Sequence, residues 1–228
     1  MLPGNLVPGS STKRFAAIVF DMDGVLVHST PLHDQAYRTL LADFGITEFD
    51  YRPFAGRKTL DSVRILNDQH RLGLDEAGLR ATAKRKTELA LDLLRSVNPI
   101  ASGACELLET LKKAGLRLAV ASSASPESID LFLDINNLRG FFEVVLSSAD
   151  VREAKPSPEI YVKACERLGV LPAATAIVED AVAGVEAGRG AGAVVFGVTG
   201  TYLAEDLLQS GTEVCVDQLL ELVPFLTA

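Results

Sequence analysis

Acidic, hydroxyl and cationic side chains follow four separate apolar runs of this sequence. They are Asp21, Asp23, Ser122, Lys155, Glu179 and Asp180. Each run is short and continuous and is rich in β-branched or aromatic residues, a pattern typical of strands that are buried on both faces of a parallel sheet. Ligands of such sheets bind outside the carboxyl ends of the strands. We therefore expect these side chains to meet at one edge of the sheet.

This combination of residue types fits phosphoryl transfer. Several carboxylates in one cleft repel one another unless a cation lies among them, and oxygen ligands favour Mg²⁺. Asp21 can act as a nucleophile that forms an aspartyl-phosphate, and Asp23, two residues later, can act as general acid and base. The Ser122 hydroxyl and the Lys155 ammonium can hold the oxygens of the phosphoryl group.

Each of these residues also has a purely structural interpretation. Asp21 or Asp23 could serve only as a turn or capping residue. Ser122 could be a helix cap, Lys155 a solvated surface lysine, and Glu179 a group behind the metal ligands rather than a ligand. The occurrence of all of them at successive strand ends favours a shared site, because the fold alone would produce only one or two such coincidences.

The apolar runs alternate with helix-like segments along most of the chain. The predicted strands are residues 16–20, 116–121, 144–146, 176–178 and 193–196, with a weaker one at 214–216. The predicted helices are residues 102–114 before Gly115, 126–138 after Ser125, 158–168 after Ser157, and a short helix at 219–226. This alternation predicts an α/β fold whose core is a Rossmann-like parallel sheet with right-handed crossovers.

A long polar-faced segment separates the first two strands, and we expect it to form an inserted helical cap. One helix in it has the spacing of a buried stripe, and residues 79–95 read as a second amphipathic helix. The stripe consists of Tyr37, Leu40, Leu41 and Phe44. The predicted division is a flexible tail over 1–14, an α/β core over 15–28 and 97–228, and the cap over 29–96.

Composition excludes several classes of protein. The 228 residues include 22 basic and 30 acidic side chains, a net charge of −8, and 48% are hydrophobic. The chain is too apolar for a disordered protein and too acidic for a general nucleic-acid-binding surface. No signal peptide and no membrane span is expected. Cys105, Cys165 and Cys215 form no CxxC pair, so we expect buried thiols and a cytoplasmic location.

The motifs resemble those of a known family. Asp21-Met22-Asp23-Gly24-Val25-Leu26, Ser122, Lys155-Pro156, and Glu179-Asp180 with Gly184 are similar, in order, to the four motifs of the haloacid dehalogenase (HAD) superfamily. The match runs from about Phe15 to Val198. The insert resembles the small helical cap of the branch that contains β-phosphoglucomutase and the sugar-phosphate and phosphoglycolate phosphatases. The resemblance implies Mg²⁺-dependent phosphoryl transfer in a cleft between core and cap.

The resemblance also implies a role for each core residue. Asp21 would be the nucleophile and a metal ligand, and Asp23 would be the general acid and base. The metal would be held by Asp21, the backbone carbonyl of Asp23, Glu179 and Asp180. Ser122 and Lys155 would bind the phosphoryl group.

The cap decides the substrate, and its match to the family is mixed. His33, Gly56 and Lys86 stand at positions where β-phosphoglucomutase has functional cap residues, and Arg57 is a further candidate for substrate binding. Thr59, however, stands where the mutase has the arginine that grips the second phosphate; Arg57 or Lys58 could substitute for it in a different register. His28 replaces an aspartate. His33 could equally be a packing histidine and Lys86 a solvated residue.

We therefore expect a phosphomonoester hydrolase that acts on a small phosphorylated metabolite, such as a sugar phosphate. The alternative is a sugar phosphomutase of the β-phosphoglucomutase type, and a third is a non-catalytic regulatory protein on this fold. Asp23 argues against cleavage of carbon–halogen bonds, because a leaving alkoxide needs a proton donor. The family resemblance implies a monomer, and we expect the cap to open and close over the site.

Overall fold

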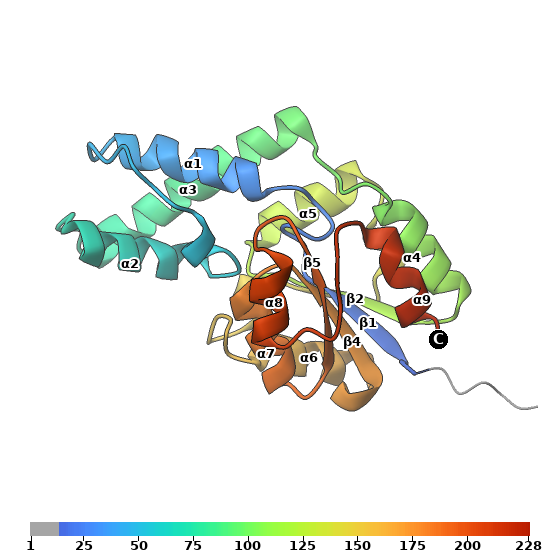
Figure 1. The fold of residues 1–228 in the computed structure, drawn as a ribbon. Coiled ribbons are helices and arrows are strands. Elements are labelled where there is room, and N and C mark those ends of the chain that lie inside the picture. The colour runs from blue at the N-terminus through green and yellow to red at the C-terminus, as the bar shows by residue number, and fades with distance from the viewer. Residues whose placement is uncertain (1–13) are drawn as a thin grey trace, which may run out of the picture.

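A parallel sheet of six strands forms the centre of the part of the chain that the structure describes, residues 14–228 of a computed structural model (Figure 1). The strand order is β3-β2-β1-β4-β5-β6. The strands are β1 (Ala17–Phe20), β2 (Arg117–Ala121), β3 (Val144–Leu146), β4 (Thr175–Glu179), β5 (Val194–Val198) and β6 (Cys215–Val216). The predicted α/β fold is confirmed. The predicted tail lies outside the described residues except for Arg14.

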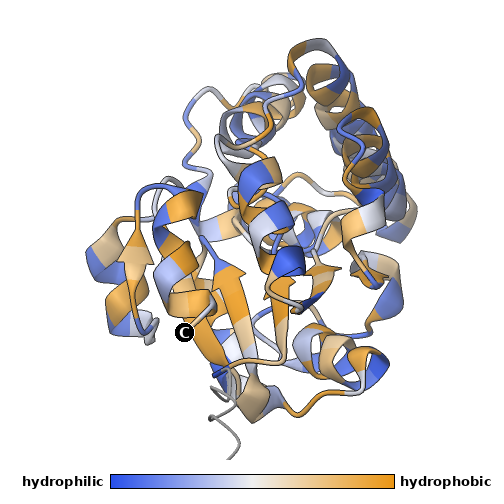
Figure 2. Cartoon of the chain, turned by 90° about the vertical axis from the view of Figure 1, so that its right-hand side faces the viewer, coloured by the Kyte–Doolittle hydropathy of each residue, from blue (hydrophilic) through white to orange (hydrophobic). Residues whose placement is uncertain are grey.

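Helices cover both faces of the sheet, which explains why its strands are continuously apolar (Figure 2). In β1, Ile18 and Phe20 belong to one buried cluster, and Val19 belongs to the other. The helices on the first face are α4 (Ala104–Lys113), α5 (Pro126–Ile135) and α9 (Val223–Leu226). Those on the second face are α6 (Glu159–Leu168), α7 (Val182–Gly190) and α8 (Ala204–Ser210).

The helix ends follow local capping rules, with two differences from expectation. The Ser125 hydroxyl caps α5 by accepting from the backbone of Ser128, as predicted. The helix ends three residues early, at Ile135, because Asn137 has a left-handed φ of 55° that turns the chain away. In α6, Pro158 rather than Ser157 is the N-cap residue.

Residues 30–97 hold three long helices beside the sheet, and we call this segment the cap. It comprises α1 (Thr30–Ala42), the short helix η1 (Arg52–Phe54), α2 (Thr59–His70) and α3 (Glu76–Val97). Tyr37, Leu40 and Leu41 are buried in a small core of their own, as predicted. The prediction that Phe44 belongs to the buried stripe is wrong, because α1 ends at Ala42 and Phe44 is 37% exposed. That the cap is a separate domain stays a prediction.

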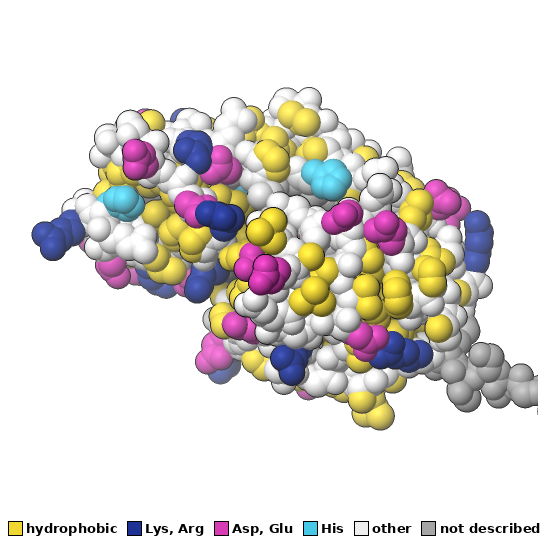
Figure 3. Space-filling view, in the orientation of Figure 1, with side chains coloured by type: hydrophobic (Ala, Val, Ile, Leu, Met, Phe, Trp, Pro, Cys, Tyr) yellow, Lys and Arg dark blue, Asp and Glu magenta, His cyan; other side chains and the backbone are white. Residues whose placement is uncertain are grey.

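Two further expectations concern the surface of the molecule. Of the three cysteines expected to be buried, Cys165 is buried and Cys215 is half-buried. Cys105 is exposed, because it occupies the outer side of α4 next to Glu106. Within residues 14–228, none of the helices combines the length and the apolar character needed to cross a membrane. Basic and acidic side chains are interspersed over the face seen in Figure 3.

Candidate active site

Asp21 and Asp23 lie at the carboxyl end of β1, where the chain turns away from the sheet. Gly24 makes this turn with a left-handed φ of 85°. A Cβ atom at Gly24 would collide with the carboxylate of Asp180, which follows β4. Glycine is therefore required at position 24 for two reasons: the left-handed backbone conformation and the close approach of the two strand ends. The turn brings acids from β1 and β4 together, as the sequence predicts.

The ammonium of Lys155 lies at the centre of a buried network. Its Nζ donates to Asp21 Oδ1 at 2.5 Å, to Glu179 Oε1 at 2.6 Å and to the Tyr161 hydroxyl at 2.9 Å. Lys155 is only 2% exposed, so it is not a solvated surface lysine. The two carboxylates raise its pKa more than burial lowers it, and the ammonium therefore stays charged at neutral pH.

Glu179 supports Lys155 from behind rather than facing the cavity. Its Oε1 accepts from Lys155 and from Tyr161, and its Oε2 accepts from the backbone amides of Asp180 at 3.0 Å and Ala181 at 3.2 Å. A Cβ atom at Gly184 would collide with this carboxylate. Both oxygens of Glu179 are thus engaged, and this arrangement fits a group that positions Lys155 better than the predicted metal ligand.

Asp23 has a different environment from Asp21, although both follow β1. Its Oδ1 accepts from the Ser29 hydroxyl at 2.5 Å and from His33 Nε2 at 3.0 Å, and the Ser122 hydroxyl lies 3.5 Å from its Oδ2. Burial alone would raise the pKa of Asp23, but interactions with His33 and Ser29 outweigh it and lower the pKa to about 2. Asp23 is therefore a carboxylate in this state of the site.

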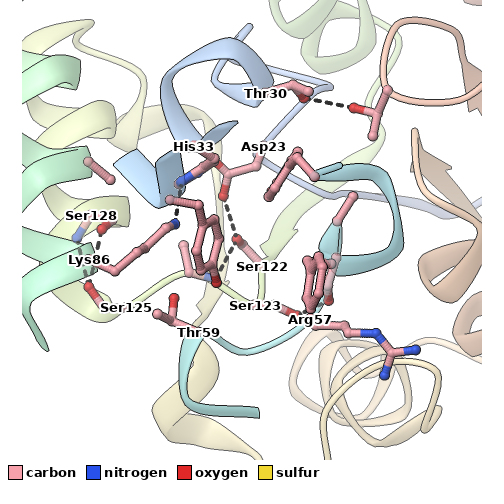
Figure 4. Close-up of a pocket in the computed structure, with 18 of the residues that line it drawn as sticks. Asp23, Thr30, His33, Arg57, Thr59, Lys86, Ser122, Ser123, Ser125 and Ser128 are labelled. Atoms are coloured by element: carbon pink, nitrogen blue, oxygen red, sulfur yellow. Dashed lines mark hydrogen bonds and ion pairs between the residues drawn. The ribbon is translucent and has the colours of Figure 1, made fainter. Parts of the chain in front are cut away.

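A hydrogen-bonded chain runs from the cap to Asp23 (Figure 4). The Lys86 ammonium on α3 lies 2.7 Å from His33 Nδ1 and 4.6 Å from the centre of the Tyr37 ring. Lys86 is 4% exposed, so neither it nor His33 is the solvated or merely packed residue of the structural alternative. Burial and the Lys86 charge lower the pKa of His33. The neutral ring thus accepts from Lys86 and donates its Nε2 proton to Asp23.

The remaining acids carry more negative charge than Lys155 can offset. If Asp21, Glu179 and Asp180 are all ionised, the single ammonium of Lys155 leaves an excess of two negative charges. Burial, followed by the Glu179 charge, raises the pKa of Asp180 well above its usual value. For Asp21, burial is again the largest cause and raises the pKa to about 7, although Lys155 opposes it. Such an excess fits a bound divalent cation.

Side chains alone do not complete a metal site in the described part of the chain. No three His, Cys, Asp or Glu side chains come together there closely enough to hold an ion. The carboxylates of Asp21 and Asp180 remain as acidic oxygens at the β1–β4 edge, and the family resemblance adds the backbone carbonyl of Asp23 as an expected donor. The Thr201 hydroxyl donates to Asp180 and orients it.

The cavity above these residues is small, about 50 Å³, and cap and core both line it. Its Gly56 wall is attached to the core, because the Ser123 hydroxyl donates to the Gly56 carbonyl at 2.7 Å. Arg57 also lines the cavity, but its Nε donates to the Pro53 carbonyl, and its guanidinium points away from Asp23 and His33 in Figure 4. All ten predicted site residues thus lie in or against this site, with Arg57 at its margin.

Three residues of the site escaped sequence reasoning. Thr201 follows β5, so the rule that found the other strand-end residues could have found it. Ser29 precedes α1 and was visible only as part of a linker. Tyr161 lies inside α6, and nothing in its spacing distinguishes it from a packing aromatic residue.

Fold and site together define an α/β enzyme with an acid-rich edge and a helical cap. The chain belongs to the haloacid dehalogenase-like hydrolases, whose family model matches residues 15–192. The family resemblance is therefore confirmed. The similar proteins include some named as phosphatases and some named as phosphomutases.

Three of the similar proteins illustrate this range. The chain is 32% identical over 178 residues to a phosphorylated carbohydrates phosphatase of Thermotoga maritima, covering 77% of this chain and 81% of the relative. It is 31% identical over 245 residues to a β-phosphoglucomutase of Mycobacterium tuberculosis, covering 92% of each. A mutant of CbbY from Rhodobacter sphaeroides in complex with xylulose-(1,5)bisphosphate has a TM-score of 0.79 at 26% identity, covering 91% of this chain and 96% of that chain.

Proposed function

We propose that this protein is a Mg²⁺-dependent phosphomonoester hydrolase that acts on a sugar monophosphate through an aspartyl-phosphate. One observation carries the proposal: Asp21 is held by the buried ammonium of Lys155 beside a second carboxylate, Asp23. A nucleophile next to a general acid and base is the pair of groups that transfer of a phosphoryl group to water requires.

In the first step, a carboxylate oxygen of Asp21 forms a bond to phosphorus while the ester bond from phosphorus to the sugar oxygen breaks. The leaving oxygen takes a proton from Asp23. A bound phosphate brings negative charge close to Asp23 and raises its pKa, which favours the protonated form that this step needs. In the second step the water oxygen forms a bond to phosphorus while the bond from phosphorus to the Asp21 oxygen breaks, which frees the Asp21 carboxylate and releases phosphate. Asp23, again ionised, accepts a proton from the attacking water. Lys155 and the Ser122 hydroxyl hold the phosphoryl oxygens.

Asp21, Asp180 and the backbone carbonyl of Asp23 would hold Mg²⁺. When bound, the ion offsets the excess of two charges and the charge of the phosphoryl oxygens. We expect chelation by EDTA to abolish phosphate release and added Mg²⁺ to restore it. Activity that persists at full strength after exhaustive chelation would contradict the metal requirement.

The placement of the basic side chains of the cap favours hydrolysis of the sugar phosphate over its isomerisation by a mutase. A mutase must hold a second phosphate at the cap end of the cavity. Lys86 is engaged with His33, and Lys58 donates to the Val151 carbonyl at 2.6 Å. Arg57 remains as a candidate, but it lies at the margin of the cavity and its guanidinium points away from Asp23 and His33 (Figure 4). The wall near α5 carries hydroxyl groups instead, which suit a neutral sugar. A monophosphate therefore fits better than a bisphosphate.

The proposal is tested by phosphate release from a panel of sugar monophosphates and bisphosphates with Mg²⁺. We expect turnover of at least one monophosphate and much slower turnover of bisphosphates. Asp21→Asn should reduce the rate about a thousandfold or more while the protein stays folded, because the nucleophile is lost. Release that survives this substitution unchanged would remove the catalytic assignment.

A sugar phosphomutase is the second candidate. The Lys86–His33–Asp23 chain supports it, since a cap that contacts the general acid and base can exclude water from the intermediate. It predicts that glucose 1-phosphate becomes glucose 6-phosphate faster than free phosphate accumulates. Stoichiometric phosphate release would exclude this candidate.

We further propose a monomer that works in the cytoplasm. All three cysteines are free thiols, as expected for a reducing compartment. Light scattering of the purified protein tests the monomer, and an elution mass of a dimer would contradict it.

A further inference from the structure

The amino group of Lys58 joins the cap to the core. Lys58 is the N-cap residue of α2, and its Nζ donates to the carbonyl of Val151 at 2.6 Å and lies 3.5 Å from that of Arg152. The partners are backbone carbonyls, so no acid has to be ionised for the contact to form. Because donor and acceptors belong to cap and core, the contact exists only while the two are apposed.

The same core segment, residues 151–154, is held from its other side by α6. Glu159 accepts from the backbone amides of Arg152 at 2.9 Å and Glu153 at 2.8 Å. Lys163 donates to Glu159 at 2.6 Å and supports this arrangement. The amides of the segment therefore face α6, while two of its carbonyls face Lys58. The chain then continues directly into Lys155, whose ammonium binds Asp21.

Two other side-chain hydrogen bonds hold the neighbouring cap loop against the core. The Ser123 hydroxyl donates to the Gly56 carbonyl at 2.7 Å, and the Tyr202 hydroxyl donates to the Arg52 carbonyl at 2.7 Å. Neither contact involves residues 151–154. The Ser123 contact adjoins Ser122, whereas the contact of Lys58, among the described hydrogen bonds of this loop, is the one that reaches the backbone leading to Lys155.

We propose that Lys58 is a positioning residue that couples cap closure to the segment carrying Lys155. Closing the cap places a charged donor on the carbonyls of Val151 and Arg152, and this fixes the segment from both sides. Opening the cap returns both carbonyls to water, so that the segment is then held by Glu159 alone. Phosphate binding and exclusion of water then occur together. The inference rests on the proposed function, because it assigns Lys155 to phosphate binding.

Lys58→Met, which keeps the length of the side chain and removes the donor, tests this coupling. Tyr202→Phe is the matched comparison, since it removes a cap–core hydrogen bond that does not touch residues 151–154. Two quantities are measured for each variant and the wild type: kcat and KM on the sugar phosphate that the wild type hydrolyses fastest, and amide hydrogen exchange with and without Mg²⁺ and inorganic phosphate. Lys58→Arg serves as the conservative variant.

In the wild type, we expect phosphate with Mg²⁺ to slow amide exchange across residues 151–155. Lys58→Met should lose this protection and lower kcat about tenfold, the effect of one hydrogen bond to a charged group, with an unchanged thermal midpoint. Lys58→Arg should recover most of both. Tyr202→Phe should keep the protection, even where weaker closure raises its KM.

Three results would overturn the proposal. The first is no ligand-dependent protection of residues 151–155 in the wild type, and the second is full protection in Lys58→Met. The third is an equal loss in Tyr202→Phe, which would show that Lys58 contributes only to general closure. Failure of the proposed function looks different: the wild type would then release no phosphate from the panel, and the exchange measurements would still decide whether Lys58 couples cap and segment.

Discussion

Asp21 and Asp23 show how two residues of one type acquire different chemistry from their surroundings. Burial raises the pKa of Asp21 to about 7, against the opposing effect of Lys155. Burial acts in the same direction on Asp23, but His33 and Ser29 outweigh it and lower the pKa to about 2. Environments that push two pKa values apart are the mark of groups with separate roles in a reaction. The proposed roles need the opposite order, with Asp21 ionised and Asp23 protonated; a cation bound beside Asp21 would lower its pKa, and a phosphate beside Asp23 would raise that of Asp23.

Tyr161 gives the first prediction at the residue scale. Its hydroxyl contacts both Lys155, at 2.9 Å, and Glu179, at 2.5 Å, in a fully buried position. Tyr161→Phe keeps the ring and removes these contacts. We expect kcat/KM to fall about tenfold, because hydrogen bonds to buried charged groups are worth roughly 1.5–3 kcal/mol. Steady-state kinetics on the best sugar phosphate measures this, with circular dichroism as the control for folding. Unchanged kinetics would show that Glu179 alone positions Lys155.

At the scale of single elements, helix α7 has to approach the strand end that carries Glu179. Gly184 permits this approach, because a Cβ atom there would collide with the Glu179 carboxylate. Alanine is favoured over glycine inside a helix by about 1 kcal/mol. Overpacking against a buried charged network costs about 1–3 kcal/mol and outweighs that gain.

Gly184→Ala is therefore predicted to lower the free energy of unfolding and to reduce activity, since Glu179 has to move. Gly140→Ala is the matched control, because open space surrounds Gly140. Urea unfolding and phosphate release of both variants measure the difference. A Gly184→Ala variant as stable and as active as the control would show that α7 can shift without cost.

Helix α6 provides a prediction about pH. Hydrogen bonds from the Glu153 amide and from Lys163 lower the pKa of Glu159 from 4.5 to about 2. The ionised carboxylate is thus favoured in the folded state. Its contribution to stability is present above the unfolded-state pKa of 4.5 and is lost as the pH falls towards 2.

Glu159→Gln should accordingly be less stable than the wild type at about pH 6, and the gap should narrow as the pH falls below about 4.5. Glu166→Gln, on the exposed side of the same helix, is the control. Urea unfolding over this pH range gives the comparison. A gap that is constant with pH would assign the effect of Glu159 to packing rather than to its charge.

At the scale of the whole molecule, cap and core are held together by hydrogen bonds of residues 52–58 with the core. Lys58, Ser123 and Tyr202 provide three of them. The cavity volume of about 50 Å³ is small beside the roughly 300–1,000 Å³ of ordinary ligand pockets. We therefore expect the cap to open before a sugar phosphate can enter.

Crystals grown with and without beryllofluoride and Mg²⁺ test this motion. We expect the cap to rotate as a unit about the segments at residues 24–29 and 98–103, with α1 and α3 keeping their mutual packing. Identical cap–core geometry in the two crystals would contradict it. The net charge of −8 does not oppose entry of a phosphate, because the cavity also holds Lys86 and its field depends on the bound cation.

The sheet and most of the catalytic edge could be predicted from the sequence. Continuous apolar runs identify strands covered on both faces, and the carboxyl ends of parallel strands necessarily share one edge. Asp21, Ser122 and Asp180 could therefore be assigned to one site before any contact was known. These inferences succeed because they depend only on chain direction and short-range spacing.

Only the tertiary structure decided how these residues are partnered. The contact of Lys86 with His33 and the contact of Lys58 with Val151 join segments 53 and 93 residues apart. The partners of Glu179, which are Lys155, Tyr161 and two backbone amides, fit the alternative of a group behind the metal ligands, and its role as a ligand stays a prediction. Spacing along a chain places a side chain at a strand end. The partner that it meets there depends on how distant helices pack.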